Sequence, residues 1–210
     1  MDRIKVIGYM PLFYGKSYIR ESLMSVINHV DQFVILYTPQ PSHGHGTTMQ
    51  CPDTEEELLK IALEVCGDKL IWNNQVYTHE GEQRGRIYDY TANRDFDLVL
   101  ACDADEIWHE EELDKALRLA YEGDKKYYGI DGFINFWRSF SFCMTDTFRP
   151  IRITNLKNQS GEGVVPCTIY HFSCAQDEQT TRFKYSCHGH ADEIRHNYLQ
   201  DVFYAWTPEN

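Results

Sequence analysis

The feature that most constrains the fold of this chain is a regular alternation of short apolar runs and amphipathic segments over residues 1–124. Continuous apolar runs bounded by turn residues are typical of strands buried on both faces of a parallel sheet. The predicted strands cover residues 4–9, 33–37, 69–72 and 97–102. The predicted helices cover residues 17–30, 54–67, 80–93 and 110–123. Because parallel strands are joined by right-handed crossovers, this order predicts a mostly parallel sheet with helices on both faces.

Capping signals mark two of the predicted helices. Ser17 is predicted to be the N-cap of the first helix. Thr54 and Glu57 form a capping box before the second helix, and Gly67 lies just past its end. Residues 39–52 are rich in Pro, Gly and His without periodicity, so we expect a loop that can cover a ligand.

The pattern changes after residue 125, where strand-like runs follow one another. We expect strands at residues 127–137, 147–154 and 164–172 as antiparallel additions, and a final helix over residues 192–205. The fold class is therefore α/β. With 42% hydrophobic residues and no linker or repeat, the 210 residues are expected to form a single domain.

Composition argues against several classes of partner. The formal net charge is −12, from 32 acidic and 20 basic residues, and the longest basic run is the pair Lys125 and Lys126. A nucleic-acid partner is less favoured, because phosphate neutralisation needs clustered Lys and Arg. The seven cysteines have no regular spacing, and no apolar stretch approaches the ~18 residues of a membrane span. With no signal peptide evident, we expect a cytoplasmic protein without a transmembrane segment.

Two aspartates follow the predicted strand 97–102, at the edge of the sheet where parallel α/β proteins bind ligands. In an extended segment, residues i and i+2 point the same way, so Asp103 and Asp105 are predicted to reach one cation. Hard oxygen donors favour Mg²⁺ or Mn²⁺ over zinc. A structural alternative stays open, in which Asp105 and Glu106 stabilise the start of the next helix through its dipole.

A family resemblance sharpens this hypothesis. Residues 99–107, Val-Leu-Ala-Cys-Asp-Ala-Asp-Glu-Ile, resemble the DxD segment of GT-A glycosyltransferases, especially small family 2-like members, and residues 4–37 are similar to their opening strand, helix and strand. The resemblance implies a Rossmann-like GT-A fold in which residues 1–124 bind a nucleotide sugar and residues 125–210 face the acceptor. Residues 37–40 depart from the family pattern, so the contact with the nucleobase stays unassigned.

The resemblance also implies roles in the donor site. Asp103 and Asp105 would hold Mn²⁺ or Mg²⁺ against the diphosphate of the donor, for which we expect a UDP-linked sugar. A basic residue near the phosphates is expected on the helix before the DxD strand, where Arg84 and Arg86 are the candidates; both are otherwise ordinary surface arginines. Tyr9, in the first predicted strand, is included among the donor-binding residues.

Further candidates lie downstream of the DxD segment. The family commonly uses a histidine there as a metal or phosphate ligand, which points to His171 and His190 ahead of His188. Lys184 is a candidate contact for the departing diphosphate. Each of these residues has an alternative role as a structural or solvated side chain.

An inverting transfer needs a carboxylate that removes the proton of the acceptor hydroxyl. Asp192 and Glu193 are preferred as this base because they follow the His-Gly-His segment, although acids also stabilise helix starts. The remaining candidates are Asp131, Asp177 and Glu178. Trp137 is assigned to a wall for the acceptor, which we expect to be a glycan or another hydroxyl-bearing molecule.

The predicted function is a divalent-metal-dependent glycosyltransferase, transferring a hexosyl or pentosyl group. Two other functions stay open: a nucleotidyltransferase, disfavoured because the segment 9–16 carries one glycine, and a non-catalytic protein that binds nucleotide sugars. A zinc site made by Cys174, Cys187, His188 and His190 is disfavoured because its spacing matches no common pattern. His43 and His45 are interpreted as part of a polar loop.

Overall fold

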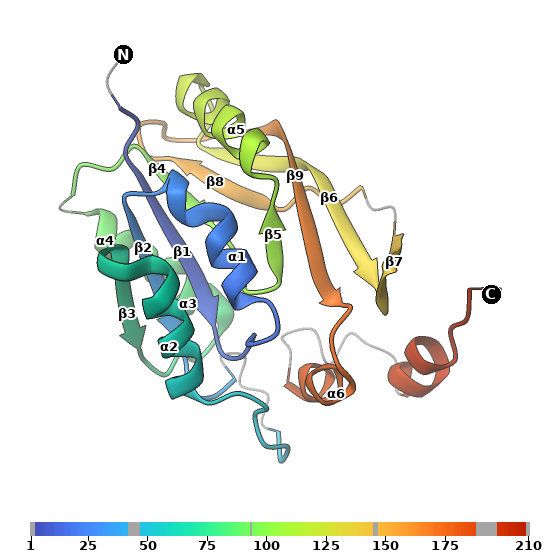
Figure 1. The fold of residues 1–210 in the computed structure, drawn as a ribbon. Helices are drawn as coiled ribbons and strands as arrows, with labels where there is room; N and C mark the ends of the chain where they lie inside the picture. The colour runs from blue at the N-terminus through green and yellow to red at the C-terminus, as the bar shows by residue number, and fades with distance from the viewer. Residues whose placement is uncertain (1–2, 42–46, 93, 145–146, 188–196, 209–210) are drawn as a thin grey trace.

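Four parallel strands from the first half of the chain lie side by side in a computed structural model (Figure 1). β1 (Val6–Leu12) lies between β2 (Gln32–Tyr37) and β4 (Leu98–Ala101), and β3 (Leu70–Asn74) lies outside β2. Their residues are mostly apolar and buried, as the continuous runs predicted. The parallel part of the predicted sheet is therefore confirmed. The structure describes residues 3–41, 47–92, 94–144, 147–187 and 197–208.

Helices cover both faces of this sheet, which confirms the predicted fold class. α1 (Ile19–Val26), α2 (Glu55–Cys66) and α5 (Glu110–Glu122) pack their apolar sides into the core on one face. α3 (Glu80–Gly85) and α4 (Ile87–Thr91) lie on the other face, as Figure 1 shows. No helix in the described part of the chain is long and apolar enough to span a membrane.

The capping box of the second helix is confirmed. The Glu57 backbone N–H donates to the Thr54 hydroxyl over 3.3 Å, and the Thr54 N–H donates to the Glu57 carboxylate over 3.2 Å. Gly67 ends this helix in a conformation with positive φ that favours glycine.

Two details of the helix predictions are wrong. Ser17 is not the N-cap of α1; Tyr18 holds that position without a side-chain cap, because the backbone carbonyl of Gly15 accepts the first N–H groups of the turn. The predicted helix over residues 80–93 is divided into α3 and α4 at Arg86. Two glycines in α3 lower its helix propensity, which is consistent with its short length.

The second half of the chain extends the same sheet beyond β4. β8 (Ile151–Asn155) pairs antiparallel with β4, β6 (Tyr127–Trp137) follows it, and β9 (Glu162–Cys174) comes next. β5 (Glu106–Trp108) and β7 (Ser139–Met144) were not predicted as strands; they pair antiparallel with β9 and β6. The three predicted strands are confirmed, but β9 runs parallel to β6, not antiparallel.

Short helical segments complete the described chain. α6 (Glu178–Cys187), which the sequence analysis missed, lies near the carboxyl ends of the strands. Single 3₁₀ turns occur at Ile27–His29 and Gly67–Lys69. The predicted helix over residues 192–205 lies partly outside the described residues, and its described part contains a π-helical turn, Leu199–Tyr204.

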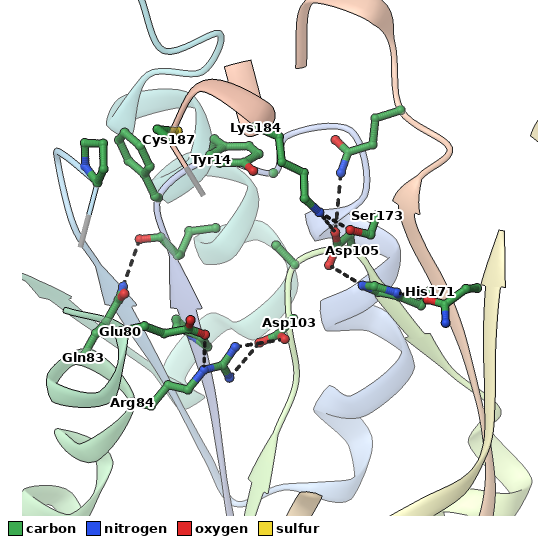
Figure 2. Close-up of a pocket in the computed structure, with 18 of the residues that line it drawn as sticks. Tyr14, Glu80, Gln83, Arg84, Asp103, Asp105, His171, Ser173, Lys184 and Cys187 are labelled. Atoms are coloured by element: carbon green, nitrogen blue, oxygen red, sulfur yellow. Dashed lines mark hydrogen bonds and ion pairs between the residues drawn. The ribbon is translucent and has the colours of Figure 1, made fainter. Parts of the chain in front are cut away.

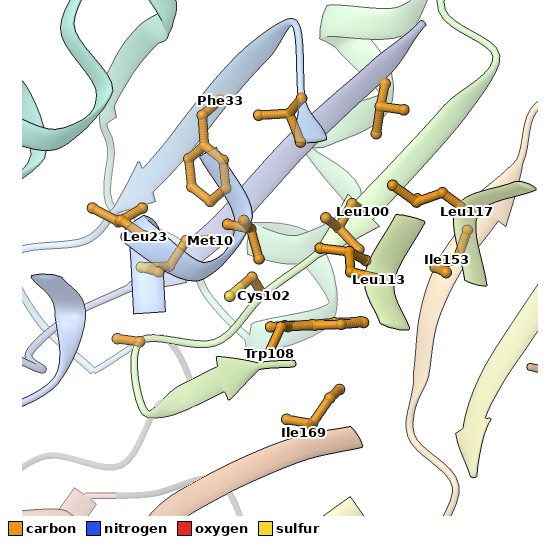
Figure 3. Packing of buried hydrophobic residues seen from close by; sticks show 14 of the residues in the cluster. Met10, Leu23, Phe33, Leu100, Cys102, Trp108, Leu113, Leu117, Ile153 and Ile169 are labelled. Carbon is orange, nitrogen blue, oxygen red and sulfur yellow. The ribbon is translucent and has the colours of Figure 1, made fainter. Parts of the chain in front are cut away.

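A shared core fixes the segment that links β4 to β5. Cys102, just after β4, and Trp108, on β5, are buried in one cluster with Leu113 of α5 and Ile169 of β9 (Figure 3). Burying a large apolar side chain contributes about 1.5–3 kcal/mol. The turn at residues 103–105 is thus anchored by packed side chains on both sides.

Candidate functional site

A cavity of about 530 Å³ opens at the carboxyl ends of β1 and β4, where ligands bind in parallel α/β sheets. Its walls come from the segment after β1, from α3, from the turn after β4, from β6 and β9, and from α6 (Figure 2). Of the predicted site residues, Arg84, Asp103, Asp105, His171 and Lys184 line it. The fold therefore brings together residues separated by up to a hundred positions in the chain.

The two aspartates occupy a turn, so the predicted extended segment is wrong. β4 ends at Ala101, and the Glu106 N–H donates to the Asp103 carbonyl over 3.1 Å to close the turn. As a result the Asp103 and Asp105 carboxylates contact different partners within the same cavity, as Figure 2 shows.

Asp103 is held by two arginines. Its Oδ2 accepts from Arg84 over 3.1 Å and from Arg152 over 3.0 Å, and its Oδ1 lies 3.0 Å from Arg84 Nη1. Burial alone would raise the pKa of Asp103, but the positive charges of Arg152 and Arg84 outweigh burial and hold this pKa well below its usual value. Asp103 is therefore ionised and its charge is balanced.

Arg152, on β8, is a site residue that the sequence analysis missed. Its Nε donates to the fully buried Glu106 carboxylate over 2.9 and 3.1 Å, and that carboxylate accepts the Asp103 N–H over 3.2 Å. The Arg152 side chain is only 13% exposed. The one signal in the sequence is an arginine between two isoleucines in a predicted strand, which on its own does not identify its partners.

Asp105 faces a histidine and a lysine. Its Oδ1 lies 3.6 Å from His171 Nε2, and its Oδ2 lies 3.7 Å from Lys184 Nζ. The other ring nitrogen of His171 is hydrogen-bonded to the Asn135 side-chain oxygen. Because an amide oxygen only accepts, Nδ1 donates this hydrogen bond, and Nε2 is the ring nitrogen that faces Asp105.

This pair fits a divalent cation. A carboxylate oxygen and an imidazole nitrogen that face one another suit Mn²⁺ or Mg²⁺, and the hydrogen bond that Nδ1 of His171 donates to Asn135 leaves Nε2 as the nitrogen available to an ion. Among the described residues, no group of three or more His, Cys, Asp or Glu is arranged to hold a metal. Ions of this kind commonly take only one or two protein ligands and complete their shell with substrate phosphates and water.

The segment after β1 packs closely against the DxD turn. Gly15 has φ +147, and a Cβ there would lie 2.6 Å from the Ala104 Cβ. The Gly15 N–H donates to Asp53 over 2.7 Å, which ties this segment to the loop before α2. Gln83, which the sequence analysis did not single out, is buried and donates to the Leu36 carbonyl over 2.6 Å at the end of β2.

Several predicted site residues do not line this cavity. Arg86 pairs with Asp89 at 2.5 Å on the surface of α4. Tyr9 is buried and lines a second cavity of about 250 Å³, which Arg152 also lines, and its side chain is hydrogen-bonded to Arg84. Trp137 is buried against Phe203, with ring centroids 5.2 Å apart. These placements follow from side-chain direction within a strand or helix, which the sequence pattern did not resolve.

The aromatic residues that do line the cavity are Phe13, Tyr14, Phe133 and Phe148, and the ring centroids of Phe133 and Phe148 lie 6.0 Å apart. Among the other candidate bases, Asp131 pairs with Arg149 over 2.8 Å and Asp177 accepts the Thr180 N–H over 2.9 Å, and neither lines the cavity. The remaining residues considered from sequence lie outside the described residues: His43, His45, His188, His190, Asp192 and Glu193.

Comparison with known proteins gives similarity of structure only. No family model matches the chain, and no curated protein matches it. Residues 1–349 of S. aureus TarS in complex with UDP-GlcNAc give a TM-score of 0.45 at 15% identity, covering 63% of this chain and 35% of that one. Glucosyl-3-phosphoglycerate synthase from Mycobacterium tuberculosis, in complex with Mn²⁺, UDP and phosphoglyceric acid, gives 0.47 at 11% identity, covering 90% and 76%. The chain thus spans about a third of the TarS chain.

A third similar structure is 4-diphosphocytidyl-2C-methyl-D-erythritolsynthase from Anaerococcus prevotii DSM 20548, with a TM-score of 0.52 at 9% identity. The match covers 85% of this chain and 96% of that one. At this identity it supports a shared α/β fold with helices on both faces of the sheet. The chain therefore has a Rossmann-like α/β fold.

Proposed function

We propose that this protein is a glycosyltransferase that takes a sugar from a nucleoside diphosphate donor, with UDP as the expected nucleotide. The observation that carries the proposal is the pairing of Asp105 Oδ1 with His171 Nε2, 3.6 Å apart, in a cavity at the carboxyl edge of the sheet. The resemblance of residues 99–107 to the DxD segment supports the same function.

Asp105 and His171 are the residues that would hold Mn²⁺ or Mg²⁺, with Asp103 beside them in the same turn. When bound, such an ion neutralises the negative charge that develops on a departing diphosphate. The electrostatic environment of Asp103 differs from that of Asp105, because the charge of Asp103 is already balanced by Arg84 and Arg152. We therefore assign Asp103 to orienting these arginines and the turn, and Asp105 to direct contact with the ion.

Arg84 and Lys184 are proposed to bind the phosphates. Arg84 is 28% exposed, is carried by a short helix and also pairs with the more exposed Glu80 over 2.6 Å, so it can turn towards an anion in the cavity. Lys184 approaches from α6 on the opposite wall and is hydrogen-bonded to Ser173. Arg152 is fixed by Glu106 and stays beneath the site. Two cations on opposite walls suit a diphosphate lying between them.

The acceptor is proposed to enter beside Phe133 and Phe148, because aromatic faces pack well against sugar rings and both line the cavity. Asp192 and Glu193 remain the proposed bases for an inverting transfer. His190 remains a proposed further ligand of the metal ion. Gln83, at the ends of β1 and β2, is proposed to shape the space for the nucleobase.

Donor turnover tests the proposal. The protein is incubated with Mn²⁺ and UDP-glucose, UDP-galactose or UDP-N-acetylglucosamine, and UDP release is measured. We expect release with at least one donor, reduced about a hundredfold or more by Asp105→Asn. Asp131→Asn is the matched control, since Asp131 is exposed and outside the cavity. Release from no donor, or equal release by the Asp105 variant, would contradict the proposal.

A second assay separates a nucleotidyltransferase. This activity would release pyrophosphate from CTP or UTP in the presence of a sugar phosphate. Enzymes of that class usually carry a glycine-rich basic loop after the first strand, whereas this chain has a single glycine, Gly15, in that segment. We therefore expect no pyrophosphate release.

A further inference from the structure

A row of paired residues forms the floor of the second cavity, on the side of the sheet that α4 covers. The strands β4, β8, β6 and β9 lie side by side in that order (Figure 1). Thr154 of β8 lies opposite Val99 of β4 and opposite Tyr127 of β6. Tyr127 in turn lies opposite Glu162 of β9. Because directly paired residues of neighbouring strands share a face of the sheet, these four side chains line one cavity.

The cavity contains polar side chains that the fold leaves unsatisfied. Tyr88, Tyr127, Thr154 and Glu162 line it, and within the described part of the chain their side chains have no hydrogen-bond partner. Thr154 is only 8% exposed. Buried polar groups in folded proteins are normally hydrogen-bonded. The Thr154 hydroxyl therefore needs a partner that enters the cavity, either water or a ligand.

The charges around the cavity argue against an anionic ligand. Arg152 lines both cavities, but it already donates to Glu106 and Asp103. Lys126 lies 5.4 Å from the centroid of the Tyr127 ring and does not line the cavity. The remaining charge on the lining is the exposed carboxylate of Glu162. These groups suit a neutral ligand whose hydroxyl groups donate to a carboxylate.

The tyrosines add flat apolar surface to these polar groups. Tyr88 is 42% exposed and Tyr127 is partly exposed, so their rings are open to a ligand. A sugar ring has both kinds of complementary group, because its C–H groups pack against aromatic faces and its hydroxyls exchange hydrogen bonds. A cavity of about 250 Å³ with this lining suits one neutral saccharide unit.

The strand β8 connects this cavity to the first one. Phe148, three residues before β8, lines the first cavity, Arg152 lines both, and Thr154 lines the second. Arg152 and Thr154 point to the same face and are separated by two residues, about 7 Å along the strand. A ligand that reaches from Phe148 to Thr154 must therefore extend beyond a single ring.

We infer that the second cavity binds a saccharide unit of the acceptor, so that the acceptor is an oligosaccharide of at least two units lying along β8. This inference rests on the proposed glycosyltransferase function. The unit that receives the sugar lies beside Phe148 in the first cavity. A neighbouring unit packs against Tyr88 or Tyr127, donates to Glu162 and exchanges a hydrogen bond with Thr154.

Saccharide binding without UDP and Mn²⁺ tests the inference separately from donor turnover. The probe is an array of linear glucose, galactose, mannose and N-acetylglucosamine saccharides, each from one to six units long. We expect binding to at least one series, about tenfold tighter for two or more units than for the single sugar.

Three substitutions locate the binding in the second cavity. Glu162→Gln, Thr154→Val and Tyr88→Ala should each raise the dissociation constant for the bound saccharide about tenfold, because each removes one contact. Glu111→Gln, at an exposed position on α5 outside both cavities, is the matched control and should leave binding unchanged. Circular dichroism melting confirms that each variant is folded.

The possible outcomes separate this inference from the proposed function. A folded parent that binds no saccharide, or binding that all three substitutions leave unchanged, overturns the inference, as does a single sugar that binds as tightly as its longer chains. Uridine binding that is lost in Glu162→Gln would assign the cavity to a nucleobase and also overturn it. A parent that binds saccharides in this cavity but releases UDP from no donor contradicts the proposed function and not the saccharide site.

Discussion

At the scale of single residues, the site depends on how four charges are balanced. Glu106 is fully buried and Asp103, Arg84 and Arg152 are partly buried around it, and each carboxylate has a guanidinium within hydrogen-bond distance. Such a network adds little net stability when complete, but removing one member leaves an uncompensated buried charge. Arg152 is therefore the residue whose loss the network tolerates least.

Arg152→Met is expected to lower the free energy of unfolding by about 3–5 kcal/mol, because it leaves Glu106 buried without a cation. Urea denaturation followed by circular dichroism measures this change. Arg149→Met, which removes an exposed arginine two positions before β8, should change the free energy by less than about 0.5 kcal/mol. Equal effects of the two substitutions would show that the buried network does not form.

The depressed pKa of Asp103 makes a prediction about acid stability. A carboxylate whose pKa is lower in the folded state contributes stability above its unfolded pKa, and that contribution is lost as the pH falls through the folded value. We expect the free energy of unfolding to fall as the pH drops below about 4, where Asp103 becomes protonated in the unfolded chain. In Asp103→Asn this part of the pH dependence should be absent. A parallel pH profile for parent and variant would contradict the charge balance described for Asp103.

At the scale of elements, the close contact between the segment after β1 and the DxD turn sets the shape of the cavity. Gly15→Ala would place a Cβ 2.6 Å from the Ala104 Cβ, at a backbone conformation that disfavours any side chain. We expect a loss of about 1–3 kcal/mol of stability and Mn²⁺–UDP binding that is about tenfold weaker. Differential scanning calorimetry and isothermal titration measure these two effects.

Gly85→Ala is the matched control, because nothing lies within 4 Å of its added Cβ at the end of α3. It should leave UDP binding unchanged and stability equal or slightly higher, as expected from helix propensity. If both alanine variants bind UDP like the parent, the packing of Gly15 against the turn does not shape the donor site.

The elements differ in how far the sequence predicted them. The four parallel strands have continuous apolar runs, and the Thr54 capping box marks α2, so these elements were predicted from local pattern. β5 is three residues long and follows a turn, which is too short for a periodic signal. α6 has polar residues on several sides and few apolar ones, so its helical pattern is weak.

At the scale of the whole molecule, the sequence indicated five of the residues that line the cavity, Arg84, Asp103, Asp105, His171 and Lys184, but not their contacts. Asp105 and His171 were selected as ligands, and the structure places them 3.6 Å apart. Arg152 was missed because its partner Asp103 is 49 positions away, and the register between β8 and β4 cannot be obtained from a single strand pattern. Long-range pairing is thus the information that only the structure supplies.

The central claim is that Asp105 and His171 together bind a divalent cation that secures the donor diphosphate. Isothermal titration of UDP into the protein, with and without Mn²⁺, tests it most directly, using the parent, the Asp105→Asn, His171→Gln double variant and the Asp131→Asn control. We predict that Mn²⁺ strengthens UDP binding in the parent and the control, and that the double variant, still folded, loses this effect. UDP binding that does not depend on Mn²⁺ in the parent, or a dependence that persists in the double variant, would contradict the claim.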